Sequence, residues 1–157
     1  MKDTENKVLD NEYEVIEQND NDLLNALLNT EDVNTKTVFM PRFKSYFTVK
    51  SISSDDYNRL ETRCKYPVKN KRTHQIEEKV DQEKLSLLLI KDACVKPNWA
   101  DPKLLDKYKT NDPCTVIKKR LLIGELSTLT AAIMDISGFN DDIETIKNSS
   151  SPAEKQD

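Results

Sequence analysis

The residue types that carry most enzyme chemistry are few and scattered in this sequence. Its 157 residues include one histidine, His74, and two glycines, Gly124 and Gly138. A single histidine excludes an HExxH zinc site and a Cys2His2 finger. The two glycines lie too far apart for a phosphate-binding loop or a dinucleotide-binding turn, which need closely spaced glycines. The sequence therefore predicts no metal site and no cofactor site of these kinds.

The three cysteines, Cys64, Cys94 and Cys114, are odd in number and widely spaced. This pattern argues against a disulfide framework and favours reduced thiols in a reducing compartment. Cys114 follows an Asp-Pro pair, but no cysteine has the basic setting that activates a thiol nucleophile. His74 lies among lysines and is expected at the surface. We therefore predict no catalytic residue.

Pairs of adjacent acids could be mistaken for a general acid and base. Examples are Asp55-Asp56, Glu77-Glu78 and Asp141-Asp142. Neighbouring residues on a helix point about 100° apart, so such pairs are expected to be solvated or to cap helices.

Charge is unevenly distributed along a chain whose net charge is −4. Residues 1–35 hold two basic and ten acidic groups, whereas residues 36–80 hold eleven basic and five acidic groups. The basic block could bind nucleic acid. It could equally be a solvated stretch that attracts the acidic N-terminal segment, and the sequence pI near 5.2 favours this second interpretation. The longest apolar runs are far shorter than the about 20 residues of a membrane span, and no signal peptide is expected.

Residues 1–19 lack apolar periodicity and are expected to form an acidic flexible segment. A short helix should follow, capped by Asp20 or Asp22. Its four leucines fall on one stripe: Leu23, Leu24, Leu27 and Leu28. A helix of about eight residues is unstable alone. The stripe must therefore dock within its own domain or in the groove of a partner.

Elements of both kinds are predicted between residues 37 and 121. Residues 37–52 are rich in aromatic and β-branched residues and predict a small hairpin interrupted by Pro41. A helix should begin near Ser54 or Asp55, and residues 68–79 are polar and transitional. A well-buried helix should follow from about residue 80 to residue 94. Asp-Pro pairs at 101–102 and 112–113 then predict the starts of two further helices.

The strongest periodicity lies near the C-terminal end of the chain. Leucines and isoleucines are spaced by four and three residues, as on one helix face, at Leu122, Leu126, Leu129, Ile133 and Ile136. Gly138 should end this helix, and Gly124 should mark a junction or a close helix approach. We therefore expect a mostly α-helical α+β fold with five to six helices and a small N-terminal β-hairpin.

The order of these features resembles the XkdN-like tail assembly chaperones of bacteriophages and prophage-derived tail particles. The resemblance rests on the helix followed by Pro97-Asn98-Trp99, the segment LLIGEL at 121–126 and the ending Ser137-Gly138-Phe139. The leucine stripe and the segment FMPR at 39–42 also fit. It predicts one domain over residues 20–147, with a disordered tail over residues 148–157.

The resemblance implies a function without catalysis or a cofactor. Proteins of this family are similar to factors that bind the tape-measure protein and keep it soluble in the host cytoplasm until the tail tube forms. The tail tube protein and self-association are further candidate contacts, and neither nucleic acid nor membrane is implied. Candidate partner-binding residues are the four leucines of the stripe with Leu122, Leu126, Leu129 and Ile133.

Two alternatives remain open at this point. The chain could be a minor structural component that stays in the tail. It could also be a DNA-binding regulator, with residues 112–123 and 125–136 as a helix-turn-helix joined at Gly124. The second of these helices carries no Lys or Arg to contact phosphates, which argues against it.

Overall fold

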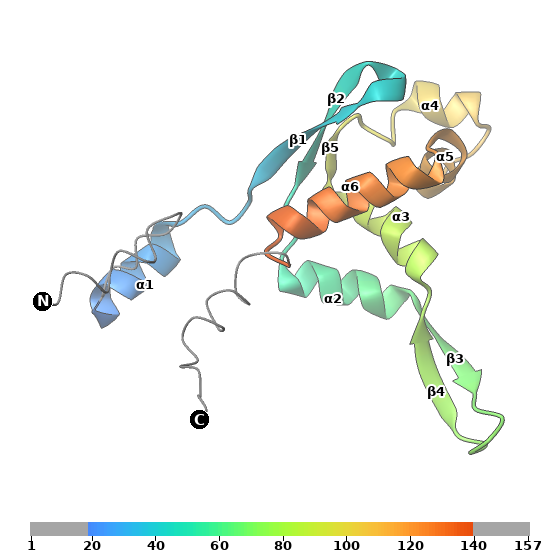
Figure 1. Cartoon of the computed structure of the whole chain (residues 1–157), viewed down its shortest axis with the longest axis horizontal. Helices are drawn as coiled ribbons and strands as arrows, with labels where there is room; N and C mark the ends of the chain where they lie inside the picture. The colour runs from blue at the N-terminus through green and yellow to red at the C-terminus, as the bar shows by residue number, and fades with distance from the viewer. Residues whose placement is uncertain (1–18, 140–157) are drawn as a thin grey trace, which may run out of the picture. The chain divides into compact units, whose positions relative to one another are not determined.

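The computed structural model describes residues 19–139 (Figure 1). These residues form six α-helices and two small antiparallel sheets. The mostly helical fold with a small hairpin is confirmed: the hairpin expected over residues 37–52 lies at residues 35–50, and so not at the very N-terminus of the chain. The second sheet was not predicted. The chain divides into two compact units, and the second begins at Val33. We call the described part of this second unit the body.

Helix α1 (Asp20–Asn29) belongs to the first unit. Asn19 caps it, because the backbone N–H of Asp22 donates to the Asn19 side chain over 2.9 Å. The helix itself is confirmed, but the predicted cap at Asp20 or Asp22 is wrong. The capping residue lies one position before Asp20. No residue of α1 is buried.

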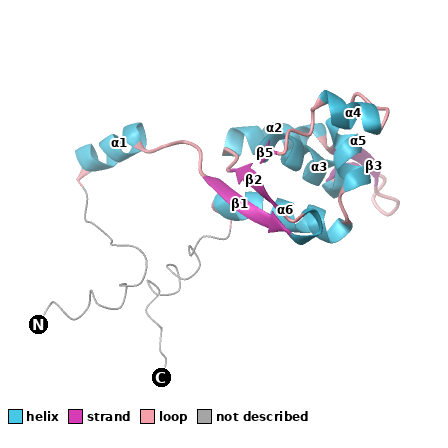
Figure 2. Ribbon diagram, turned by 90° about the horizontal axis from the view of Figure 1, so that it is seen from above, coloured by secondary structure: helices cyan, strands magenta, loops and turns pink. Residues whose placement is uncertain are grey.

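The first sheet of the body is built on the predicted hairpin. Strand β1 (Thr35–Met40) pairs with β2 (Ser45–Lys50), and the 3-10 turn η2 (Pro41–Phe43) joins them. Proline cannot donate to the strand ladder, which explains why β1 ends before Pro41. A third strand, β5 (Cys94–Lys96), pairs with β2 and gives the order β1-β2-β5 (Figure 2).

The second sheet is a hairpin that the sequence did not reveal. Helix α2 (Ser54–Arg63), capped by Ser53, leads into β3 (Lys65–Lys69) and β4 (Ile76–Val80). Almost every residue of the two strands is exposed, so there is no alternation of buried and exposed positions to recognise. The hairpin extends away from the rest of the body (Figure 1).

Helix α3 (Gln82–Ala93) is the centre of the body. It packs against α2, α6 (Ile123–Ile136), α5 (Pro113–Arg120) and strands β2 and β5. Half of its twelve residues are buried: Leu85, Leu87, Leu88, Leu89, Ile90 and Ala93. This confirms the predicted well-buried helix. It also divides the core into two clusters, because its opposite faces meet different neighbours.

The predicted Asp-Pro helix starts are both confirmed. Asp101 caps α4 (Pro102–Lys107), and Asp112 caps α5, each with proline at the first helical position. Gly138 follows the end of α6 with a φ of 90°, which is the left-handed backbone expected of it. Gly124 is the second residue of α6, beside the expected junction, and nothing lies within 4 Å of a Cβ built there. The expected close helix approach at Gly124 is therefore wrong.

Helix α6 is held to the hairpin by a two-pronged ion pair. The Arg42 guanidinium donates to both carboxylate oxygens of Glu125, over 2.6 and 2.7 Å, and to the backbone oxygen of Arg120 over 2.7 Å. The Glu125 carboxylate also accepts from the N–H of Leu122, the residue before the helix. The hydrogen bonds from Arg42, more than the opposing effect of burial, hold the pKa of Glu125 below its usual value.

Replacement of a buried isoleucine on α6 should be far more damaging than replacement of an exposed one. Ile133 is fully buried, so Ile133→Ala should lower the free energy of unfolding by about 2–5 kcal/mol. Ile123, which is 86% exposed on the same helix, is the matched control and should lose less than about 0.5 kcal/mol as Ile123→Ala. Urea unfolding followed by Trp99 fluorescence measures both. Equal losses would show that α6 does not bury the face described.

The ion pair should also make stability depend on pH. Because the pKa of Glu125 is lowered in the folded state, its contribution is complete above the unfolded value of about 4.3 and is lost as pH falls through the folded pKa. Glu125→Gln should therefore destabilise the protein at about pH 7 and weaken its acid sensitivity below about pH 4.3. Urea unfolding midpoints across this range provide the measurement.

The matched control for this variant is Asp106→Asn. Asp106 is exposed and is not among the ion pairs of residues 19–139. This variant should retain the pH dependence of the parent protein. An unchanged acid profile for Glu125→Gln would contradict the role assigned to the ion pair.

Candidate partner-binding surface

The leucine stripe on α1 is an exposed apolar surface. Leu23 and Leu24 are 52% and 53% exposed, and Leu27 and Leu28 are 72% and 71% exposed. Residues at positions i and i+4 lie on the same side of a helix, so these four side chains form one continuous stripe. Apart from Ala26, the other residues of α1 are asparagine and aspartate. The helix therefore presents an apolar stripe and polar flanks.

The four candidate residues on α6 divide into two groups. Leu122 precedes the helix and is 58% exposed, and Leu126 is partly buried. Leu129 and Ile133 are completely buried in the larger core cluster. Their side chains pack within the body, so in this conformation they support the helix rather than present a surface. The regular spacing on α6 consequently describes a core-facing stripe with an exposed N-terminal end.

A shallow groove lies where the exposed end of α6 meets α3. It has a volume of about 460 Å³, with Leu87 and Leu126 among its apolar lining residues and Ile123 at its edge. Ile123 is the most exposed large apolar side chain described in the body. Ile123 was not predicted as a surface residue because it falls outside the spacing of four and three. Its position directly after Leu122, at the start of the helix, was the only signal.

The three cysteines are buried or partly buried thiols without a disulfide among the described residues. Burial raises the pKa of each thiol, and at Cys114 the nearby Asp112 carboxylate adds to this effect. All three are therefore kept in the neutral form, which is a poor nucleophile.

The other chemically capable residues are dispersed. His74 lies exposed in the turn between β3 and β4, with a φ of 62°. Asp55 and Asp56 both pair with Arg59 at the exposed start of α2. Asp141-Asp142 lies outside the described residues. Within residues 19–139, no three His, Cys, Asp or Glu side chains come together as metal ligands.

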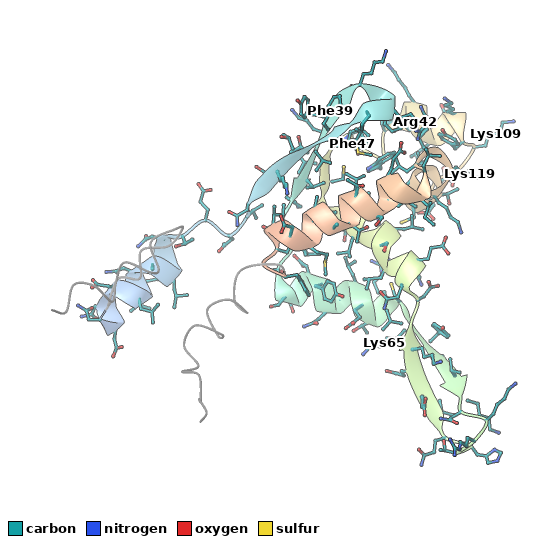
Figure 3. The ribbon with its side chains drawn as sticks, in the orientation of Figure 1. Phe39, Arg42, Phe47, Lys65, Lys109 and Lys119 are labelled. Atoms are coloured by element: carbon teal, nitrogen blue, oxygen red, sulfur yellow. The ribbon has the colours of Figure 1, made fainter. Side chains whose placement is uncertain are left out.

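The basic block of the sequence is divided between separate elements. Part of it lies on the β3–β4 hairpin, where Lys65 is near Glu78. Another part, including Arg42, lies at the β1–β2 hairpin (Figure 3). None of the helices within residues 19–139 is long and apolar enough to cross a membrane.

The helix-turn-helix alternative fits the geometry poorly. Residues Leu121 and Leu122 do separate α5 from α6. However, α6 packs against α3, β1 and β2, and it carries no Lys or Arg to meet a phosphate backbone. A recognition helix needs such contacts in addition to its base contacts.

The chain is similar to proteins of a known family. The family model of the phage XkdN-like tail assembly chaperone protein matches residues 23–148. A relative from Bacillus subtilis (strain 168), described as the uncharacterized protein YqbN, is 28% identical over 102 residues, which are 64% of this chain and 68% of that protein. The crystal structure of the protein YqbN shares the fold, with a TM-score of 0.54 and 24% identity over 71% of this chain and 90% of that chain. The chain belongs to the phage XkdN-like tail assembly chaperone family.

Proposed function

We propose that this chain keeps the tape-measure protein soluble in the host cytoplasm during tail assembly, as an assembly chaperone without enzymatic activity. The observation that carries the proposal is α1, a ten-residue helix with four exposed leucines and no buried residue. A tape-measure protein is a long helical chain that exposes apolar stripes before the tube surrounds it. A short amphipathic helix can cover such a stripe by helix-to-helix packing.

Membership in a tail assembly chaperone family supports a phage tail protein as the partner that the exposed stripe binds. The polar surroundings of α1 support it as well, because a chaperone must itself stay in solution while it offers apolar surface. Within the proposal, Leu23, Leu24, Leu27 and Leu28 make the primary contact. Leu122 and Leu126 form a separate contact on the body, whereas Leu129 and Ile133 act only by holding α6 in place.

Removal of the two most exposed leucines should abolish most of the chaperone effect. In Leu27→Gln/Leu28→Gln, glutamine preserves helix propensity while removing the apolar contact. Burying a leucine contributes about 1.5–3 kcal/mol, so the double variant should bind the tape-measure protein at least about tenfold more weakly. The measurement is the soluble fraction of the tape-measure protein when co-expressed with the full chain, followed by the affinity of the purified pair.

The matched control is Asn25→Gln/Asn29→Gln, which changes the side of the same helix that faces away from the leucine stripe. It should leave the soluble fraction unchanged. A tape-measure protein that is equally insoluble with and without the parent chain would refute the proposed function. Mass spectrometry of mature particles separates the alternative of a minor structural component, since a chaperone should be absent from them.

A further inference from the structure

A second surface, separate from the stripe and the α3–α6 groove, lies at the end of the body formed by η2, β2 and the segment that leads into α4. It is a pocket of about 500 Å³, within the range of sites that bind small molecules or peptide side chains. Its lining is mainly aromatic and aliphatic: Phe43, Tyr46, Phe47, Pro97, Trp99 and Leu104.

The inner wall of this pocket is made of buried aromatic rings, and its mouth is exposed. Phe47 and Trp99 are nearly fully buried and meet edge to face, with ring centroids 6.0 Å apart. Phe43 stacks on Phe47 at 5.5 Å. Tyr46, in contrast, is 68% exposed. An apolar side chain entering at Tyr46 would therefore meet a preformed aromatic surface, which limits the entropy lost on binding.

Of the basic side chains around the pocket, one is already paired with a carboxylate and two are not. The guanidinium groups of Arg42 and Arg120 both lie close to the Phe43 ring, at 4.4 and 4.7 Å from its centroid. Arg42 is fully engaged by Glu125. Arg120 and Lys96 also line the pocket, and neither has a carboxylate within 4.0 Å among residues 19–139.

We propose that this pocket binds an acidic, apolar segment of a partner protein. A leucine or aromatic side chain of the segment occupies the space beside Phe47 and Trp99. A neighbouring carboxylate pairs with Arg120, whose planar guanidinium suits a carboxylate, and with Lys96. Charge complementarity thus identifies the occupant: a purely apolar peptide would leave both cations unmatched, and a basic one would be repelled.

Protein is favoured over nucleic acid as the source of the negative charge. Nucleic acid binding usually needs several cations along a backbone path. Only two cations line this pocket, and the chain as a whole carries a net charge of −4, which opposes the approach of a polyanion. Lys109 and Lys119, on the neighbouring elements of the same end of the body (Figure 3), are not lining residues.

Selection from a random peptide library tests the proposal without any assumption about the tape-measure protein. Peptides that bind the immobilised full chain should combine Leu, Phe or Tyr with adjacent Asp or Glu. Trp99 is the single tryptophan of the chain and lines the pocket. Its fluorescence should therefore change on titration with a selected peptide. The same peptide with every acid replaced by its amide should bind at least about tenfold more weakly, as expected for loss of a charge-assisted pair.

The decisive variant is Arg120→Gln, with Lys119→Gln as the control from the same helix. Arg120→Gln should weaken the selected peptide about tenfold or more, Arg120→Lys should restore part of the affinity, and Lys119→Gln should bind as the parent does. Selection of no peptide, of peptides without acids, or of peptides that bind Arg120→Gln equally well would overturn the proposal. If a twelve-nucleotide oligothymidylate bound more tightly than the selected acidic peptide, the proposal would be overturned in favour of nucleic acid. The comparison of acidic and amidated peptides stays valid even if a variant folds poorly.

Discussion

The burial of α3 on nearly all sides is the constraint on which the body depends. An amphipathic helix needs one covering layer, but a helix with an uninterrupted run of leucines needs several. Leu87 and Ile90 face the cluster shared with the sheet, α5 and α6, while Leu85, Leu88 and Leu89 face the cluster shared with α2. Each neighbour covers a different strip of the same helix. The helices and strands of the body are therefore arranged around one central hydrophobic helix, α3.

Most of the fold was predictable because its signals are local. Asp101 and Asp112 with their prolines start two helices by cap chemistry alone, and the apolar run of α3 indicates its burial directly. The strands β3, β4 and β5 were missed for two different reasons. The first two have no buried face, and β5 owes its extended form to Pro97 after it and to pairing with a strand more than 40 residues away.

The candidate site was harder to predict than the fold. The leucines of α1 and those of α6 have similar helical spacing, yet the former are exposed and Leu129 and Ile133 are buried. Periodicity shows that a stripe exists but not what covers it. The aromatic pocket was beyond prediction for another reason, since it brings together Phe47, Trp99 and Arg120 from three separate stretches of the chain. The scarcity of glycine has a visible result as well: Lys44, His74 and Lys109 adopt positive φ angles that glycine would accept at little cost.

The base of the β3–β4 hairpin closes on itself. The N–H of Asp81 donates to the carbonyl oxygen of Cys64 over 2.9 Å. The two ends of the hairpin are therefore adjacent where they join the rest of the body. Neither strand lies in the two core clusters apart from Val80 at the margin. The length of the sixteen-residue segment between these points therefore does not affect how the core of the body packs. The cost of lengthening such a loop grows only slowly with its size. This position is therefore a natural point for inserting a fluorescent or affinity label without disturbing the packing around α3.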